Sequence, residues 1–291
     1  MLALVLALCS SLAWGVADFI AGLKSRSLPV VSVMLVAVST GFVLAASIVA
    51  VRGLGPPGGR YLALTALSAV LGSIGLAAFY RGLAVGAMSV VAPIAATGAA
   101  MPVAFALASG ERPAAVQVAG AALAVAGVVL AAREEAPDRT AAGRREDDRP
   151  RVAPGAALAM LAAFGLGSFL VVIGAASEGD FGWAILGNRA VSLVLLGVAA
   201  LILRPRPPAG VRDASPAVAV GVLETVANTL IAVAMTLGLV SLVGVLASLF
   251  PVVTVALGRI VLGERIAAGQ GVGTAGALIG VVLIAAGGDA A

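Results

Sequence analysis

The sequence contains no histidine and a single cysteine, Cys9. Within one chain these absences exclude histidine-based catalysis, zinc sites built from Cys and His, and an internal disulfide. Charged residues make up only 11% of the chain and aromatic residues 4%. The sequence also lacks a phosphate-binding loop, a dinucleotide-binding glycine pattern and paired catalytic carboxylates. We therefore expect no enzyme activity, no cofactor, no metal and no direct use of ATP.

Small apolar residues dominate instead. Of 291 residues 61% are hydrophobic and 37 are glycine, and the mean hydropathy is +1.14. One soluble core of this length cannot bury so much apolar surface. The apolar runs are continuous and about 20 residues long, as membrane-spanning helices require, whereas barrel strands alternate and are shorter. We predict an all-α, multi-pass membrane protein, located in the plasma (inner) membrane.

Charges and Pro/Gly clusters divide the chain into ten apolar segments of membrane-spanning length. The stretch 133–151 has six Arg and six Asp or Glu, which is typical of a solvated linker. We predict a five-helix unit at 1–132, a linker at 133–151 and a second five-helix unit at 152–291. The segments are Leu2–Leu23, Val30–Val51, Tyr61–Tyr80, Leu83–Ser109, Ala114–Ala132, Val152–Ala176, Phe181–Leu203, Ala214–Gly238, Leu239–Leu262 and Ile266–Gly287.

The two units repeat one another in sequence. A Gly-Glu-Arg motif and five downstream residues recur at an offset of 153, and a motif in the first helix recurs at an offset of 150. Because each unit has an odd number of crossings, the second enters the membrane from the opposite side. Such inverted repeats are typical of secondary transporters, whose substrate site lies near the midplane between the repeats. The matches are Gly110-Glu111-Arg112, Gln117, Gly120, Gly127-Val128 and Leu130 with Gly263-Glu264-Arg265, Gln270, Gly273, Gly280-Val281 and Leu283, and Trp14–Phe19 with Phe164–Phe169.

These motifs resemble the EamA family of the drug/metabolite transporter superfamily, and the resemblance covers the whole chain. It implies ten helices, a central cavity between the halves, and export or exchange of small metabolites such as amino acids or drugs. It does not fix the substrate. The family's first helix commonly has a small neutral residue at the position of Asp18, so this chain departs from the pattern there.

Three ionisable residues fall inside predicted spans: Asp18, Arg189 and Glu224. A charge at the centre of a membrane helix costs about 2.5 to 3.5 kcal/mol, so such residues usually face a partner or a water-filled cavity. Arg189, which follows Asn188, either pairs with one of the two acids or binds an anionic group of the substrate. Trp14 in the first segment is either a cavity wall or an interfacial residue. Our candidates for the substrate or proton pathway are therefore Trp14, Asp18, Asn188, Arg189 and Glu224.

The charges are not shared by the two repeats. Asp18 corresponds to Ser168, and Arg189 corresponds to Ser39. The common scaffold is thus built without them, which indicates a specific role. We predict that Asp18 is a proton-coupling or cation-binding residue, because a protonatable acid in a low-dielectric cavity is an economical coupling device.

Several backbone features complete the list of candidates. Pro93 and Pro102 in the fourth segment and Pro251 in the ninth remove backbone hydrogen bonds, so we predict helix kinks there. The freed carbonyls either line the pathway or merely accompany a bend. Glycines at four-residue spacing within 269–280 give flat helix faces for packing, or for a homodimer contact.

The function predicted from the sequence is secondary transport. The partners would be a small-molecule substrate and the lipid bilayer; no nucleic acid is expected, because the Arg residues sit in short loops and form no basic stripe. Two alternatives remain: a non-transporting membrane subunit or sensor, and a membrane-embedded lipid-modifying enzyme. For orientation, 14 Lys and Arg follow odd-numbered segments and 3 follow even-numbered ones. The positive-inside rule then puts both termini outside, whereas the family resemblance implies cytoplasmic termini.

Overall fold

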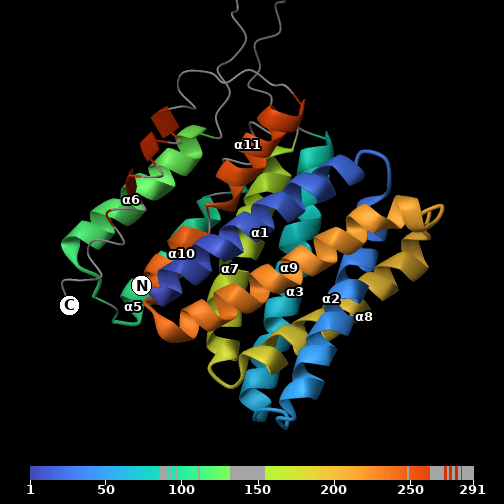
Figure 1. Ribbon diagram of the computed structural model, residues 1–291, viewed down its shortest axis with the longest axis horizontal. Coiled ribbons are helices and arrows are strands. Elements are labelled where there is room, and N and C mark those ends of the chain that lie inside the picture. Colours follow the sequence, from blue (N-terminus) through green and yellow to red (C-terminus); the bar gives the residue numbers. More distant parts are fainter. Residues whose placement is uncertain are drawn as a thin grey trace, which may run out of the picture.

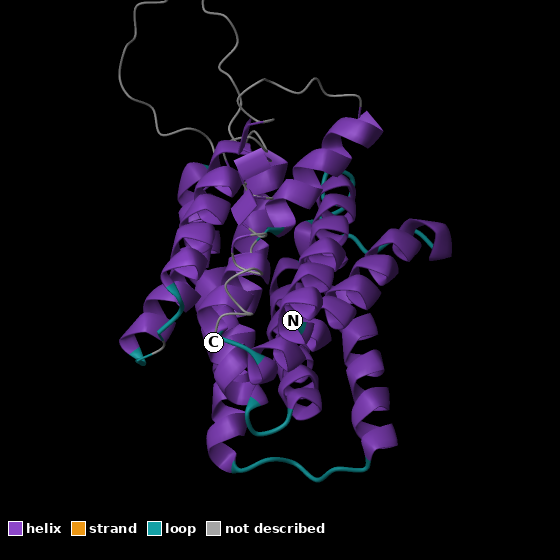
Figure 2. Ribbon diagram, turned by 60° about the vertical axis from the view of Figure 1, so that its left-hand side comes forward, coloured by secondary structure: helices purple, strands orange, loops and turns teal. Residues whose placement is uncertain are grey.

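The computed structural model describes residues 1–85, 91, 94–95, 97–110, 112–131, 155–247 and 249–262, together with 272–273, 275–276, 279–280 and 283. The described part is helical throughout (Figures 1 and 2). The charged linker at 133–151 and Pro93 lie outside the described residues. The elements are α1 (Leu2–Lys24), α2 (Val30–Arg52), α3 (Gly59–Val85), η1 (Thr97–Ala99), α5 (Ala100–Ala108), α6 (Ala115–Ala131), α7 (Ala156–Ser177), α8 (Phe181–Leu203), α9 (Val211–Leu237), α10 (Val240–Ala247) and α11 (Phe250–Leu262).

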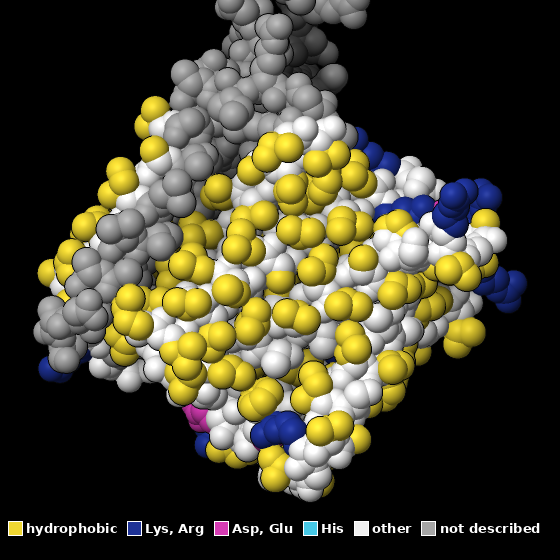
Figure 3. All heavy atoms as spheres, viewed as in Figure 1, with side chains coloured by type: hydrophobic (Ala, Val, Ile, Leu, Met, Phe, Trp, Pro, Cys, Tyr) yellow, Lys and Arg dark blue, Asp and Glu magenta, His cyan; other side chains and the backbone are white. Residues whose placement is uncertain are grey.

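Six of these helices are long and apolar enough to cross a membrane: α1, α2, α3, α7, α8 and α9. Large apolar side chains such as Val43, Val194 and Ile202 are exposed on their outer faces. Figure 3 shows one such face, covered with hydrophobic side chains, with Lys and Arg at its margins. This is the surface that a lipid solvent selects, because apolar side chains have no reason to avoid hydrocarbon tails. The prediction of an all-α membrane protein is therefore confirmed.

Helix ends follow from local sequence. The α8 helix begins where the Asp180 carboxylate accepts a hydrogen bond from the Trp183 backbone N–H at 2.9 Å, which satisfies one of the unpaired donors of the first turn. The α2 helix ends at Gly53, whose left-handed backbone (φ 62°) closes the last turn at no steric cost. The spans thus stop where capping residues meet the ends of the apolar runs.

The two halves of the chain interleave. The most extensive contacts join α1 to α9, α3 to α7, and α2 to α8, in each case one helix from each half. Figure 1 shows α1 lying beside α9, with α2 and α8 crossing at the lower right. If α1 is exchanged with α7, α2 with α8 and α3 with α9, the same three helix pairs result. The pairing therefore has the symmetry of a two-fold axis that relates the halves.

Corresponding helices run in opposite directions. We call the two ends of the bundle the Lys24 end, where Lys24 pairs with Asp213, and the Arg52 end, where Arg52 pairs with Asp180. The α1 helix finishes at the Lys24 end, whereas α7 finishes at Ser177, three residues before Asp180, at the Arg52 end. The α2 helix likewise finishes where α8 begins. The second set of three helices is therefore upside down relative to the first.

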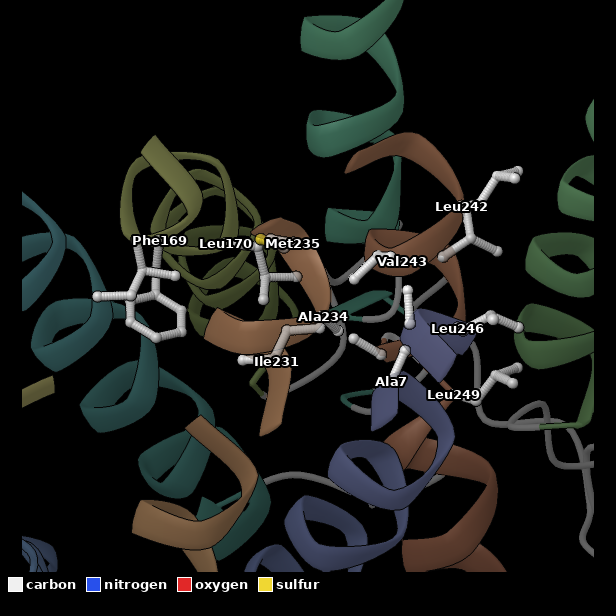
Figure 4. Packing of buried hydrophobic residues seen from close by; sticks show 14 of the residues in the cluster. Ala7, Phe169, Leu170, Ile231, Ala234, Met235, Leu242, Val243, Leu246 and Leu249 are labelled. Atoms are coloured by element: carbon white, nitrogen blue, oxygen red, sulfur yellow. The ribbon is translucent and has the colours of Figure 1, made fainter. Parts of the chain in front are cut away.

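Glycine and alanine set the distance between the paired helices. A Cβ added to Gly75 of α3 would lie 2.8 Å from the backbone nitrogen of Leu166, and one added to Gly165 of α7 would lie 2.7 Å from the Gly75 Cα. Neither position accepts a side chain. Close approach of this kind replaces the hydrophobic effect as the source of helix association in lipid. Elsewhere larger apolar residues pack together, as Figure 4 shows for Leu170, Ile231 and Met235 of one buried cluster.

Three segments differ from the sequence expectation. The fourth was expected to be one helix, Leu83–Ser109, but Leu83–Val85 belong to α3, and the 3-10 turn η1 lies directly before α5. The third helix was expected to end at Tyr80 but continues to Val85, because no residue between them is incompatible with a helix. The ninth segment was expected to be one helix, Leu239–Leu262, but is two, α10 and α11, separated at Leu249. The tenth segment is described only in part; its Gly280 packs against Gly120 and Ala124 of α6 within the same chain, so the described glycine face lends no support to a homodimer.

Candidate functional site

A single cavity combines the features of a solute site in the part of the chain that the structure describes. It encloses about 700 Å³ of empty space, counting its open mouth, and lies between helices of both halves. Its residues fall into a polar group and an apolar group. The polar group is Asp18, Ser73, Asn188, Arg189, Ser192, Glu224 and Asn228, and the apolar group is Trp14, Met34, Val38, Leu76, Leu166, Phe169, Leu170 and Phe250, with Gly72 between them.

Three members of the polar group, Asp18, Glu224 and Arg189, form a continuous chain of polar contacts together with the buried Tyr80 behind them. The Tyr80 hydroxyl lies 3.0 Å from Glu224 Oε1 and 3.3 Å from Asp18 Oδ1. Glu224 Oε2 accepts a hydrogen bond from Arg189 Nη1 at 2.9 Å. The order is therefore Asp18, Tyr80, Glu224, Arg189, contributed by α1, α3, α9 and α8. All four residues are buried, with at most 5% of each exposed.

The ion pair between Arg189 and Glu224 joins the middle of α9 to α8. Gly41 of α2 gives the Arg189 side chain the space it needs: a Cβ there would lie 3.0 Å from Arg189 Nε and 2.6 Å from Thr225 Oγ1. Arg189 Nε and Nη2 are buried and have no hydrogen-bond partner among the described residues. A buried guanidinium with two unused donors is costly, so this arrangement favours an additional acceptor from the cavity.

Other polar side chains hold the cavity wall. Asn188 Nδ2 donates to Ser68 Oγ at 2.9 Å, which ties α8 to α3. Ser73 Oγ donates to Ser192 Oγ at 3.0 Å between the same two helices. On α9, one turn beyond Glu224, the Asn228 Oδ1 atom is buried without a donor among the described residues. Asn188 therefore positions the wall, whereas Asn228 has an unused acceptor.

Aromatic rings form the apolar side of the cavity. Trp14 of α1 packs edge-to-face on Phe250, with ring centroids 6.3 Å apart, and Phe250 packs in the same way on Phe79 at 6.2 Å. Edge-to-face pairs of this kind add about 0.5 to 1.5 kcal/mol beyond the burial of their area. Trp14 is thus a cavity-lining residue held by its neighbours. The cavity presents a charged side and an aromatic side to any solute.

Pro102 and Pro251, at which kinks were predicted, lie in the first turns of helices instead. Pro251 is the second residue of α11, directly after the separation from α10, and Pro102 is the third residue of α5, which follows the 3-10 turn η1. A first turn tolerates proline because its N–H groups have no intrahelical acceptor. These prolines thus mark helix starts; Phe250, next to Pro251, reaches the cavity from this point.

Each end of the bundle has an ion pair that joins the two halves. At the Arg52 end, Arg52 donates to both oxygens of Asp180, at 2.9 and 2.7 Å, and its guanidinium lies 4.3 Å from the centre of the Phe181 ring. Burial raises the pKa of Asp180, but hydrogen bonds from Arg52 and from the Trp183 backbone N–H outweigh it, so the pKa of this carboxyl lies below its ordinary value. At the other end, Lys24 pairs with Asp213.

The structure brings together all five residues that the sequence nominated for the pathway, since Trp14, Asp18, Asn188, Arg189 and Glu224 all line the one cavity. Whether they act on a solute or a proton stays a prediction. Sequence reasoning missed Tyr80, which connects the two acids. It lay at the expected end of the third segment and so was treated as a boundary residue. The usable signal was that a Tyr buried in a membrane helix requires a partner for its hydroxyl.

Comparison with known proteins identifies the family. Residues 1–133 and 153–286 each match the EamA-like transporter family. The chain belongs to this family. It is therefore a multi-pass membrane protein with two EamA domains, as its sequence motifs predicted.

A solved structure, described only as a crystal structure of a protein, has the same fold: its TM-score is 0.76 over 97% of this chain and 95% of that one. At 18% identity this similarity shows the fold and nothing of the substrate. No curated protein sequence matches the chain.

Proposed function

We propose that this protein is a secondary transporter, an exporter or exchanger of small metabolites such as amino acids or drugs, in the plasma (inner) membrane. The observation that carries the proposal is the buried chain Asp18, Tyr80, Glu224, Arg189, of which Asp18, Glu224 and Arg189 line a cavity between helices of both halves. Ionisable groups retained at such cost inside membrane helices mark solute or proton pathways. Family membership supports transport as the activity, and catalysis is not part of the proposal.

The mechanism we propose is alternating access. The chain would have ten membrane helices in two inverted five-helix repeats that rock about the cavity. Support comes from the opposite directions of α1 and α7 and from the symmetric pairing of α1 with α9 and of α3 with α7. In transporters built from inverted repeats, rigid-body movement of one half against the other opens a fixed central site to each side in turn.

Proton coupling is the energy source we favour. Asp18 has no cation within reach among the described residues; its polar contact is with Tyr80. An acid that is not held ionised by a cation is free to gain and lose a proton as the cavity changes its exposure. Asp18→Asn should leave the protein folded and inserted while changing the dependence of transport on pH; the pH dependence that remains in this variant would come from Glu224.

Flux in proteoliposomes tests the function. Liposomes with purified protein would be given labelled amino acids, aromatic drugs and nucleotide-sugars, with and without an imposed pH gradient. We expect saturable flux of one class above protein-free liposomes, and a changed pH response in Asp18→Asn. Absence of flux for every class with folded protein would favour a non-transporting subunit or sensor. Chemical change of a lipid headgroup would instead favour the enzyme alternative.

A further inference from the structure

The contacts of the Tyr80 hydroxyl indicate how many protons the two acids, Asp18 and Glu224, hold between them. The Tyr80 hydroxyl has one hydrogen but lies within hydrogen-bonding distance of two carboxyl groups. Glu224 is paired with Arg189 and is therefore the ionised acid that accepts from Tyr80. The second contact is satisfied when Asp18 carries a proton and donates it to the Tyr80 oxygen. With one proton, the charges of Asp18, Glu224 and Arg189 sum to zero.

Arg189 has donors that this chain of hydrogen bonds does not use. Only Nη1 is bonded to Glu224; Nε and Nη2 are buried and have no partner among the described residues, and Arg189 is one of the residues that line the cavity. The N–H bonds of Nε and Nη2 leave one edge of the guanidinium in parallel, which matches the two oxygens of a carboxylate. Two unused donors on one edge thus specify a bidentate acceptor.

We propose that the free edge of Arg189 binds the carboxylate of an organic monocarboxylate with an apolar body, and that one proton is taken up on Glu224 when this anion binds. The proposal rests on the transport function above and names its substrate class. The apolar body would lie against the aromatic side formed by Trp14, Phe169 and Phe250. The unused Asn228 acceptor would bind a donor next to the carboxylate, where the solute has one.

Charge balance requires the proton. A carboxylate that enters the neutral cluster adds one negative charge where the dielectric constant is low, and such a charge is expensive unless it is compensated. The groups that face Glu224 are Asp18 from α1, Tyr80 from α3 and Arg189 from α8. The other helices that pack on α9 are α2, α7 and α10, and their charged residues are limited to Arg52 at the far end of α2. Glu224 is therefore the acid that can accept the compensating proton while Arg189 turns to the solute.

The same balance sets selectivity. Because Asp18 already carries a proton, only Glu224 can take up a further one. A monoanion is thus neutralised, whereas a phosphate dianion leaves one negative charge in the cavity. An uncharged amide of the same shape lacks the second oxygen that the Arg189 edge requires. The site should therefore prefer monocarboxylates to dianions and to amides.

The test measures binding and proton uptake together. Purified wild-type protein in detergent would be titrated calorimetrically with phenylacetate and with phenylacetamide, in two buffers that differ in ionisation enthalpy. We expect saturable binding of phenylacetate with uptake of about one proton, and affinity that falls as the pH rises, up to about tenfold per pH unit. Equal binding of the amide, or binding without proton uptake, would overturn the proposal.

Two variants test whether Glu224 accepts the proton and whether Arg189 binds the carboxylate. Glu224→Gln imitates the protonated acid, so it should bind phenylacetate with no proton uptake and little dependence on pH. Arg189→Lys keeps the charge but loses the edge, so its affinity should fall about tenfold or more. Arg52→Lys is the matched control, since Arg52 also pairs with an acid but lies at the end of the bundle, and it should bind as the wild type does.

Failure here is separate from failure of the transport function. Phenylacetate binding needs no flux, and flux of an uncharged or cationic solute needs no carboxylate site. If wild-type protein transports an uncharged or cationic solute but does not bind phenylacetate with proton uptake, the carboxylate assignment is wrong and transport stands. If phenylacetate binds with one proton but crosses no liposome membrane, the site stands and transport is wrong.

Discussion

Removing Glu224 alone should destabilise the protein more than removing Glu224 and Arg189 together. The side chains of this pair are 5% and 6% exposed. Breaking a buried ion pair by deleting one partner costs about 3 to 5 kcal/mol, because the other charge is left uncompensated, whereas replacing both is often neutral. Glu224→Gln leaves a guanidinium that cannot lose its proton, so we expect a loss in this range. Arg189→Ala leaves an acid that can be neutralised by protonation, so its cost should be smaller and should decrease as the pH falls.

The measurement is a double-mutant cycle. The free energy of unfolding in mixed micelles would be measured for wild type, Glu224→Gln, Arg189→Ala and the double variant, with the same cycle for Arg52 and Asp180 as a control. The control pair is 28% and 13% exposed and should couple by about 1 kcal/mol or less. We expect about 2 kcal/mol or more for the buried pair. Additive effects of the two single substitutions, within about 0.5 kcal/mol, would refute the reasoning.

Three further predictions follow from individual contacts. Gly41→Ala should displace Arg189 and reduce transport, because the new Cβ would lie 3.0 Å from Arg189 Nε and 2.6 Å from Thr225 Oγ1. Gly197→Ala on α8 is the control and should be neutral, because a Cβ there would have no atom within 4 Å. Liposome flux and the melting temperature would be measured for both variants. Asp180→Asn should lower the melting temperature slightly at neutral pH. Since the pKa of Asp180 is depressed in the folded protein, the difference in melting temperature between variant and wild type should vanish as the pH falls below about 4. A difference that stays constant with pH would exclude the pair with Arg52 as its source. In a Cys9→Ala background, Arg145→Cys should be protected from an impermeant thiol reagent in intact cells if the charge distribution sets the orientation; labelling means the reverse orientation.

Helix positions could be predicted well from the sequence because lipid imposes length and composition together. The α8 helix, Phe181–Leu203, has the bounds predicted for the seventh segment, and α2 differs by one residue at its end. Each is a continuous apolar run closed by charges or caps. The predicted boundaries were wrong in two places. The α3 helix continues to Val85, past the predicted end at Tyr80, and α10 and α11 are separate helices although the apolar run is continuous.

The site was predictable in its members but not in its connections. Asp18, Arg189 and Glu224 stand out because a charge inside an apolar run is rare. Hydropathy does not tell which acid meets Arg189, since that depends on how α8 and α9 rotate against each other. Tyr80 is invisible by charge, and its role appears only when α1, α3 and α9 converge. The pairing of helices across the halves supplies the information that one-dimensional patterns lack.

The most direct test of alternating access is to fix one end of the bundle. In a Cys9→Ala background, Lys24→Cys with Asp213→Cys would be joined by a cleavable bifunctional thiol reagent, and Arg52→Cys with Asp180→Cys would be joined in the same way at the opposite end. Transport of the solute found in the flux survey would be measured before cross-linking, after it and after cleavage. The account predicts that cross-linking either end stops transport and that cleavage restores it. Unchanged transport with either end fully cross-linked would contradict it.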